Sequence, residues 1–280
     1  MRADSSKSAE ATQQLANLAR AIRIDALRMV HRAKSSHIGG CFSMADLLAV
    51  LYGQVLNIDP LRPYKKDRDR FILSKGHACA ALYAVLAAKG FFPRDWLNTF
   101  YQDGSNLPGH ATHTVPGVEI STGSLGHGLP VACGMALIGK QQSDPFRVFT
   151  LLSDGECDEG SVWEAILFAG HHGLDNLIAI VDANNIQSLG RVDEVLDLKP
   201  LAEKWRACRW SVREIDGHDI AEIEATLERI PFEPHLPSCI IAHTTKGKGV
   251  GFMEDNLLWH YRSPNEQEFA EALAELGPVE

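Results

Sequence analysis

Two short apolar runs, VFTLL at 148–152 and LIAIV at 177–181, constrain the fold of this chain more than any other feature. Neither run alternates polar and apolar residues, so both are predicted to be strands buried on both faces. A helical pattern over 159–173 separates them, and strands joined by helices of this length pair in parallel with right-handed crossovers. The sequence therefore predicts an α/β fold, a doubly wound and mostly parallel sheet with helices on both faces.

The same alternation extends through the rest of the chain. Strands are predicted over 70–73, 147–153, 176–183, 211–217 and 238–245, and helices over 9–34, 43–56, 77–89, 126–140, 159–173 and 219–230. Ser43 is the predicted N-cap of the second helix. The segment 101–125 is rich in Gly, Pro, Ser, Thr and His, and loops of this length are usually functional or disordered. We expect a single domain over 1–280 with a mobile tail from about residue 264.

Composition excludes several classes of function. The 280-residue chain has a formal net charge of −9, which argues against nonspecific nucleic-acid binding. The N-terminal stretch MRADSSKSAEATQQ lacks the apolar core of a signal peptide, and no apolar run approaches the roughly 20 residues that span a membrane. Six cysteines are scattered without the paired spacing of a zinc site. We expect a cytoplasmic protein that binds neither membranes nor nucleic acids.

Polar residues stand at the ends of two consecutive predicted strands. Asp154 and Gly155 follow the strand 147–153, and Asn184 follows the strand 176–183. Ligands bind outside the carboxyl ends of parallel strands, so these side chains are expected at one edge of the sheet. Carboxylate and amide oxygens suit Mg²⁺, whose shell phosphate oxygens and water can complete. Gly155 and the helix that follows would let a phosphate approach the backbone.

These residues also carry a resemblance to a known family. The Asp-Gly pair, with Asn184-Asn185 about thirty positions later, resembles the thiamine diphosphate fingerprint GDG…NN. Five segments resemble the transketolase branch of that superfamily: SSHIGGCFSMADLLAVLY, FILSKGHACAALYAVLAAKG, LPGHATHTVPGVEISTGSLGHGLPVACGMAL, DGECDEGSVWEA…DNLIAIVDANNIQSLG and AHTTKGKGVGFMED. The resemblance runs from about residue 15 to 263.

The resemblance implies a thiamine diphosphate-binding fold and its cofactors, thiamine diphosphate and Mg²⁺, with Ca²⁺ or Mn²⁺ as substitutes. It implies transfer of a two-carbon ketol unit from a ketose to an aldose through a dihydroxyethyl intermediate on the cofactor. The metal would be bound by Asp154, Asn184 and the carbonyl of Ile186. The implied cofactor-binding residues are His37, His77, Gly123, Ser124, Leu125, Asp154, Gly155, Glu156, Asn184, Ile186 and His260.

Histidines are the implied catalytic residues. His37, His77, His110 and His260 would line the substrate channel, bind sugar hydroxyls and move protons. Glu159 and Glu164 resemble acids at the interface between paired cofactor sites. By contrast, His171, His172 and His235 lie in no motif and are predicted to be surface or packing residues, and a role for His113 is left open.

Some residues depart from the family pattern. Ser153 replaces the first glycine of the fingerprint, Tyr261 stands where the family usually has glycine, and Ser188 replaces an apolar residue near the cofactor ring. These departures bear on substrate identity more than on cofactor chemistry. Lys246 and Lys248 lack the spacing of a phosphate loop, and we expect them on a solvated loop that covers the pocket.

The resemblance covers only one domain of a transketolase. The pyrimidine-binding and C-terminal domains are expected on a partner chain, a C-terminal transketolase subunit, in a two-plus-two heterotetramer that acts on sugar phosphates. Alone, this chain is expected to be inactive. The alternatives are a catalytically silent regulatory subunit, a paralogue with another carboligation such as deoxyxylulose phosphate synthesis, and a metal-dependent hydrolase. The hydrolase would need a third or fourth protein ligand that the sequence does not reveal.

Overall fold

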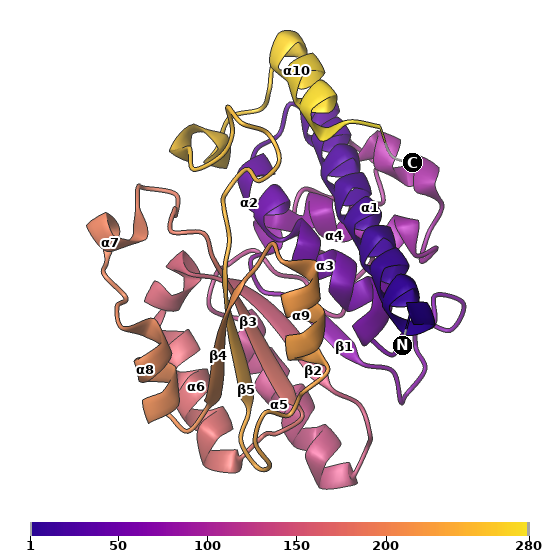
Figure 1. Ribbon diagram of the computed structural model, residues 1–280. Helices are drawn as coiled ribbons and strands as arrows, with labels where there is room; N and C mark the ends of the chain where they lie inside the picture. The colour runs from indigo at the N-terminus through magenta and orange to yellow at the C-terminus, as the bar shows by residue number, and fades with distance from the viewer. Residues whose placement is uncertain (1, 279–280) are drawn as a thin grey trace.

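A five-stranded parallel sheet forms the centre of the molecule, in the order β1-β2-β3-β5-β4 (Figure 1). The computed structural model describes the backbone of residues 2–278 and the side chains of residues 10–278. The strands are β1 (Arg70–Leu73), β2 (Val148–Ser153), β3 (Leu177–Ala183), β4 (Ser211–Asp216) and β5 (Ser238–His243). Every neighbouring pair is parallel, which confirms the predicted fold class.

Helices cover both faces of this sheet (Figure 1). The layer on one face contains α1 (Arg2–Ala33), α2 (Ile38–Ser43), α3 (Ala45–Val50), α4 (Cys79–Ala88) and α9 (Ile220–Leu227), and α10 (Glu266–Leu276) packs against α1. The other face packs against α5 (Gly128–Gln142), α6 (Gly160–His172) and α8 (Leu201–Ala207), and α7 (Val192–Val195) lies in the connection after β3.

The central strand shows why the apolar runs lack alternation. Ile178 and Ile180 of β3 belong to the hydrophobic core on the α1 side, whereas Leu177, Ala179 and Val181 belong to the core on the α5 side. Both faces of β3 are therefore buried, as expected for a parallel sheet between two helical layers.

The predicted helix over 43–56 is wrong in its start and in its continuity. The helical segment begins at Ile38, breaks at Met44 and ends in a π-helical turn over Leu51–Val55. Ser43 is the last residue of α2 rather than an N-cap, because its hydroxyl donates a hydrogen bond to the buried carboxylate of Asp182. The Ser43 side chain, which the local pattern predicted as a helix cap, is instead used in a contact with a distant strand.

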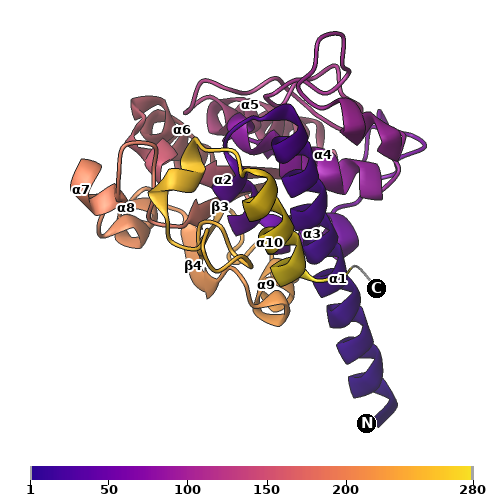
Figure 2. The same ribbon diagram turned by 90° about the horizontal axis from the view of Figure 1, so that it is seen from above.

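The segment after residue 264, expected to be a mobile tail, contains the helix α10. Asn265 and Glu268 form a capping box at its start. The His31 ring of α1 stacks on Phe269 at 4.1 Å between centroids, and Leu276 is buried. Figures 1 and 2 both show α10 alongside α1. Within residues 2–278 no helix is long and apolar enough to span a membrane.

Candidate active site

The carboxyl ends of β2 and β3 bring the predicted metal ligands to one edge of the sheet. Ser153 and Asp182 are register partners, so Asp154 and Asn184 follow directly from paired strand ends. The Asp154 carboxylate accepts hydrogen bonds from the backbone N–H groups of Gly155 at 2.8 Å and Asn185 at 2.6 Å. Both Asp154 and Asn184 are buried. The sequence therefore predicted their proximity correctly.

A buried carboxylate, Asp182, organises the floor beneath these ligands. It pairs with Lys75 and accepts hydrogen bonds from the hydroxyls of Ser43 and Thr244. Burial alone would raise the pKa of Asp182. The Lys75 charge and these hydroxyls outweigh burial and hold that pKa below its ordinary value. The Asn184 amide nitrogen lies 3.3 Å from the same carboxylate, and its amide oxygen accepts from the Ile186 N–H at 3.2 Å, which leaves one lone pair of that oxygen for a cation.

The donor set at this edge fits a divalent cation. Burial, and secondarily the charge of Asp182, raises the pKa of Asp154 to about 6, and a bound cation would offset both effects. In the part of the chain that the structure describes, no group of three or more His, Cys, Asp and Glu side chains could hold a metal. A metal here would therefore need amide, carbonyl and ligand oxygens besides Asp154, as Mg²⁺ accepts when it bridges to phosphate.

Lys246 corrects one expectation from the sequence. It was predicted to lie on a solvated loop, but it is buried, and its Nζ donates to the Ile186 carbonyl at 2.8 Å and lies 2.8 Å from His260 Nδ1. Burial, followed by the nearby Lys75 charge, lowers the pKa of Lys246 to about 8. Only Lys248 is solvated, 3.7 Å from Glu254. Two buried lysines thus stand beside the predicted metal ligands, an arrangement that favours an anion.

Four histidines from four separate segments meet at the other end of the site. The ring centroids lie 4.9 Å apart for His37 and His77, 5.3 Å for His37 and His260, and 6.3 Å for His37 and His110. Burial lowers the pKa of His37 to about 4 and that of His260 to about 3, and it holds the pKa of His77 well below its ordinary value. These three imidazoles are neutral at pH 7 and can each donate and accept a hydrogen bond.

One cavity of about 250 Å³ joins the lysine end to the histidine end. Its lining contains most residues that the resemblance implied, namely His37, His77, His110, Gly123, Leu125, Asp154, Gly155, Asn184, Ile186 and His260. It also contains Lys75 and Lys246, which the sequence did not single out as site residues, together with Gly40, Ser153, Gln187, Ser188 and Tyr261. The structure thus brings the histidine and metal-ligand predictions together in a single site.

Four implied residues lie outside this lining. Glu156 is fully buried behind the site, where its carboxylate accepts hydrogen bonds from the Ser74 hydroxyl and from the Gly126 N–H at 2.9 Å. Ser124 is exposed beside the cavity. Glu159 and Glu164 are exposed at the start of α6, away from the cavity, and their part in a subunit interface stays a prediction.

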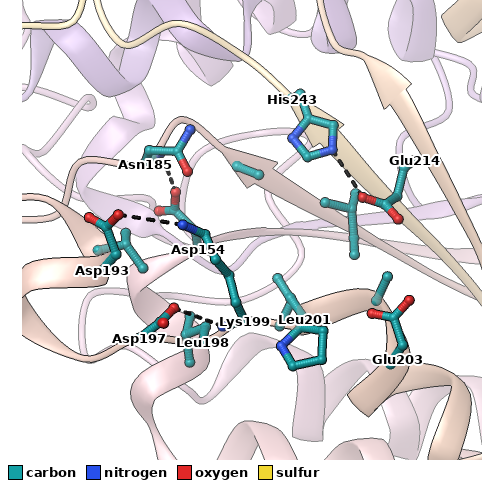
Figure 3. Close-up of a pocket in the computed structure, with 15 residues that line it drawn as sticks. Asp154, Asn185, Asp193, Asp197, Leu198, Lys199, Leu201, Glu203, Glu214 and His243 are labelled. Atoms are coloured by element: carbon teal, nitrogen blue, oxygen red, sulfur yellow. Dashed lines mark hydrogen bonds and ion pairs between the residues drawn. The ribbon is translucent and has the colours of Figure 1, made fainter.

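A larger cavity of about 430 Å³ shares Asp154 with the first (Figure 3). Five carboxylates line it, those of Asp154, Asp193, Asp197, Glu203 and Glu214. Its one lysine, Lys199, lies 3.4 Å from Asp193, and the His243 ring lies 3.1 Å from Glu214. This concentration of negative charge disfavours a phosphate, so an anionic ligand belongs in the smaller cavity with the two lysines.

Gly76 fixes the backbone that carries His77 into the site. A Cβ at this position would lie 2.3 Å from the Thr122 hydroxyl oxygen and 2.5 Å from the Thr122 carbonyl oxygen. We expect Gly76→Ala to destabilise the fold by about 1–3 kcal/mol, because the backbone of Thr122 must move. Gly134→Ala is the matched control, since its Cβ meets nothing within 4 Å on α5. Thermal unfolding of both variants checks this, and equal melting temperatures would contradict it.

Comparison with known proteins places this geometry in a family. Residues 12–278 match the family described as "Transketolase, thiamine diphosphate binding domain". The chain is 41% identical over 251 residues to an apulose-4-phosphate transketolase subunit of Phocaeicola vulgatus, covering 90% of this chain and 89% of that protein. It is 42% identical over 263 residues to a 6-deoxy-6-sulfo-D-fructose transketolase subunit of a Clostridium species, covering 94% and 96%.

Solved structures agree with these sequence matches. The transketolase from Leishmania mexicana superposes with a TM-score of 0.89 at 31% identity, over 94% of this chain and 41% of that chain. The transketolase from Campylobacter jejuni gives a TM-score of 0.88 at 34% identity, over 95% of this chain and 43% of that chain. The chain thus spans about two-fifths of the length of the solved transketolases.

Proposed function

This chain belongs to the transketolase thiamine diphosphate-binding domain family, and from that premise we propose that it is the N-terminal subunit of a two-chain transketolase. Two relatives that carry "subunit" in their names match it over nine-tenths of its length. Residues 1–280 would form one domain, and a second chain would supply the pyrimidine-binding and C-terminal domains. The complete enzyme would transfer a ketol unit between sugars.

The observation that carries this proposal is a single cavity with two different ends. At one end, two buried lysines stand beside the Asp154 carboxylate and the Asn184 amide, and at the other end four histidines converge. The first end suits a metal-bound diphosphate, and the second suits a polyhydroxylated substrate. A regulatory subunit without catalytic activity would need neither end.

Thiamine diphosphate, when bound, supplies the electron sink that lets a carbon–carbon bond next to a carbonyl break. Asp154, Asn184 and the Ile186 carbonyl would hold Mg²⁺ against the diphosphate, with Ca²⁺ or Mn²⁺ as substitutes. Lys246 would contact phosphate oxygens, and so would the Gly155 N–H, which donates to Asp154 in the absence of a ligand. The carbonyl of Ile186 now accepts from Lys246, and its second lone pair remains available to a cation.

The histidines of this chain would bind the substrate and move its protons. A neutral imidazole can donate to a carbonyl oxygen with one nitrogen and accept from a hydroxyl with the other. Because burial lowers the pKa of His37, His77 and His260, this capacity is constant across neutral pH. His110, at 6.3 Å from His37 between ring centroids, would extend the same row of contacts along the sugar.

Titration calorimetry tests the two-chain proposal. Thiamine diphosphate with Mg²⁺ is titrated into this chain alone and then into its complex with a candidate C-terminal subunit. We expect binding to tighten sharply in the complex, and transfer from a ketose to an aldose only when both chains are present. Full activity of the isolated chain would contradict the proposal, as would tight binding without activity in the complex, which favours a silent subunit. Light scattering of the complex tests the two-plus-two assembly, and a one-to-one heterodimer would contradict it.

Alkaline pH is expected to weaken cofactor binding through Lys246. Its pKa is lowered to about 8, so the ammonium is charged below that pH and its attraction for a diphosphate disappears as the pH rises through it. Between pH 7 and 9.5 the dissociation constant should rise on the order of tenfold. Lys246→Arg is the control, because arginine stays charged, so the cofactor affinity of this variant should not vary between pH 7 and 9.5. The same pH dependence in both proteins would contradict a role for Lys246.

A further inference from the structure

Two tyrosines with no role in the proposed chemistry stand at the mouth of the site. Tyr261 lines the 250 Å³ cavity, with its ring centroid 6.0 Å from that of His37 and 4.7 Å from that of His260. Tyr101 lines an adjoining cavity of about 50 Å³. They are 62% and 59% exposed, and neither hydroxyl has a hydrogen-bond partner among the described residues. We refer to Tyr101 and Tyr261 as the aromatic pair.

The two cavities meet at the catalytic candidates. His37, His77 and His110 line both of them, so a molecule held at these imidazoles reaches Tyr261 on one side and Tyr101 on the other. The smaller cavity is completed by Ser35, Ser36, Ala80, Phe100 and Gly109. No lysine or arginine of the described chain lines it. Its chemistry is therefore that of hydroxyls, imidazoles and aromatic faces, without a cation.

Tyr101 is held in place by its surroundings. Its φ of 57° is in the left-handed region that non-glycine residues seldom adopt. Its N–H donates to the Leu107 carbonyl at 2.9 Å, and a Cβ on Gly109 would lie 2.4 Å from its ring. The absence of a side chain at Gly109 lets the ring lie against the backbone beside His110. A positive φ at a non-glycine residue strains the backbone. Such strain persists only where neighbouring contacts enforce it, and it often occurs at ligand sites.

A free polar group points to the kind of ligand. The buried hydroxyl oxygen of Ser35 has no hydrogen-bond partner within the part of the chain that the structure describes. Buried polar atoms without partners are rare, and because Ser35 lines the smaller cavity, a rotation of its side chain would bring this hydroxyl to a ligand hydroxyl. Tyrosine presents an apolar ring to C–H groups and a hydroxyl to polar groups. A phosphate, in contrast, would find no positive charge from this chain in the smaller cavity.

We propose that the aromatic pair binds the part of the sugar that lies beyond the reacting carbons, and that this part is uncharged and hydroxylated where it contacts this chain. The proposal rests on the proposed transketolase function and deepens it. Tyr261 and Tyr101 become specificity-determining residues, whereas any phosphate at the far end of the sugar is left to the partner chain.

The test compares acceptors of different length in the complex of both chains, with β-hydroxypyruvate as the common donor. The acceptors are glycolaldehyde, D-erythrose and D-erythrose 4-phosphate. In Tyr261→Gly, the ratio of kcat/KM for either erythrose to that for glycolaldehyde is expected to fall on the order of tenfold, because only the longer chains reach the ring. Tyr101→Ala is expected to lower the same ratio. Tyr261→Phe removes only the hydroxyl and keeps the ring, so this variant should retain most of the wild-type ratio of kcat/KM values.

Tyr64→Ala is the matched control, because Tyr64 is 87% exposed and lines none of the cavities described above. An unchanged ratio in both Tyr261→Gly and Tyr101→Ala overturns the proposal while leaving the transketolase function intact. A loss confined to D-erythrose 4-phosphate also overturns it, because the tyrosines would then act on the phosphate. A wild-type complex inactive with all three acceptors overturns both the proposed function and this inference.

Discussion

Replacing Asp154 with asparagine is expected to weaken thiamine diphosphate binding in the presence of Mg²⁺ by at least about 100-fold, since even indirect metal contacts contribute 10–100-fold to affinity. Asp154 supplies the negative charge at the edge of the sheet that faces the proposed metal, whereas its neighbour Asp182 is ion-paired with Lys75. An amide of the same size keeps the volume but removes that charge. Calorimetry on the two-chain complex measures the change.

The same variant distinguishes a metal-binding role of Asp154 from a role in stabilising the fold. In the folded protein the pKa of Asp154 is raised from 3.8 to about 6, so above pH 6 the ionised carboxylate destabilises the metal-free fold. Asparagine lacks that penalty, but its amide has one acceptor oxygen and keeps only one of the two backbone hydrogen bonds that Asp154 accepts, so the two effects oppose each other and we expect the melting temperature of the metal-free protein at pH 8 to change little. Asp193→Asn, an acid that lines only the neighbouring cavity, is the control for charge. Cofactor affinity equal to wild type in Asp154→Asn would refute the metal-ligand role.

Replacing His37 with alanine is expected to lower kcat by about 10²–10⁴-fold, the usual contribution of a positioned proton donor or acceptor. His37 is central in the histidine group, within 4.9 Å of His77 and 5.3 Å of His260 between ring centroids. Its Nδ1 lies 2.9 Å from the Ser36 hydroxyl, which fixes the ring and leaves Nε2 for the substrate. Steady-state kinetics of the complex, with calorimetry for cofactor affinity, distinguishes catalysis from binding.

Two further measurements sharpen this result. With a pKa of about 4, His37 is neutral at and above pH 6, so the wild-type rate should show no titration of this group between pH 6 and 7.5. His171→Ala, on the last turn of α6 and away from the cavity, is the control. If His37→Ala lowers cofactor affinity as much as it lowers kcat, His37 holds the cofactor rather than handling substrate protons.

The sequence predicted the parts of this site that depend on strand order. Asp154 and Asn184 follow directly from two buried parallel strands, so the pairing of β2 with β3 was sufficient to bring them together. The four histidines come from separate segments of the chain, and no periodicity relates them. Only the family resemblance indicated that they converge.

The missed features depend on long-range contacts. Lys246 is buried because its Nζ meets the carbonyl of Ile186, sixty positions earlier, and nothing in TTKGKG reveals that partner. Ser43 was assigned to a helix cap because its bond to Asp182, on a strand far along the chain, cannot be read locally. The helix α10 was missed although Asn265 and Glu268 have the capping-box spacing, a signal that was available in the sequence.

The Asp182 floor has a consequence for how this enzyme could change its substrates. Three distant segments, carrying Ser43, Lys75 and Thr244, meet the buried carboxylate of Asp182, two positions before Asn184, so a mutation in any of them is expected to disturb folding and the proposed cofactor site together. A substitution at any of these positions is therefore disfavoured both by loss of stability and by damage to the proposed cofactor site. The exposed rim at Tyr101 and Tyr261 has no such ties to Asp182, so under the proposed function new sugar preferences could accumulate there without any change to the cofactor site below.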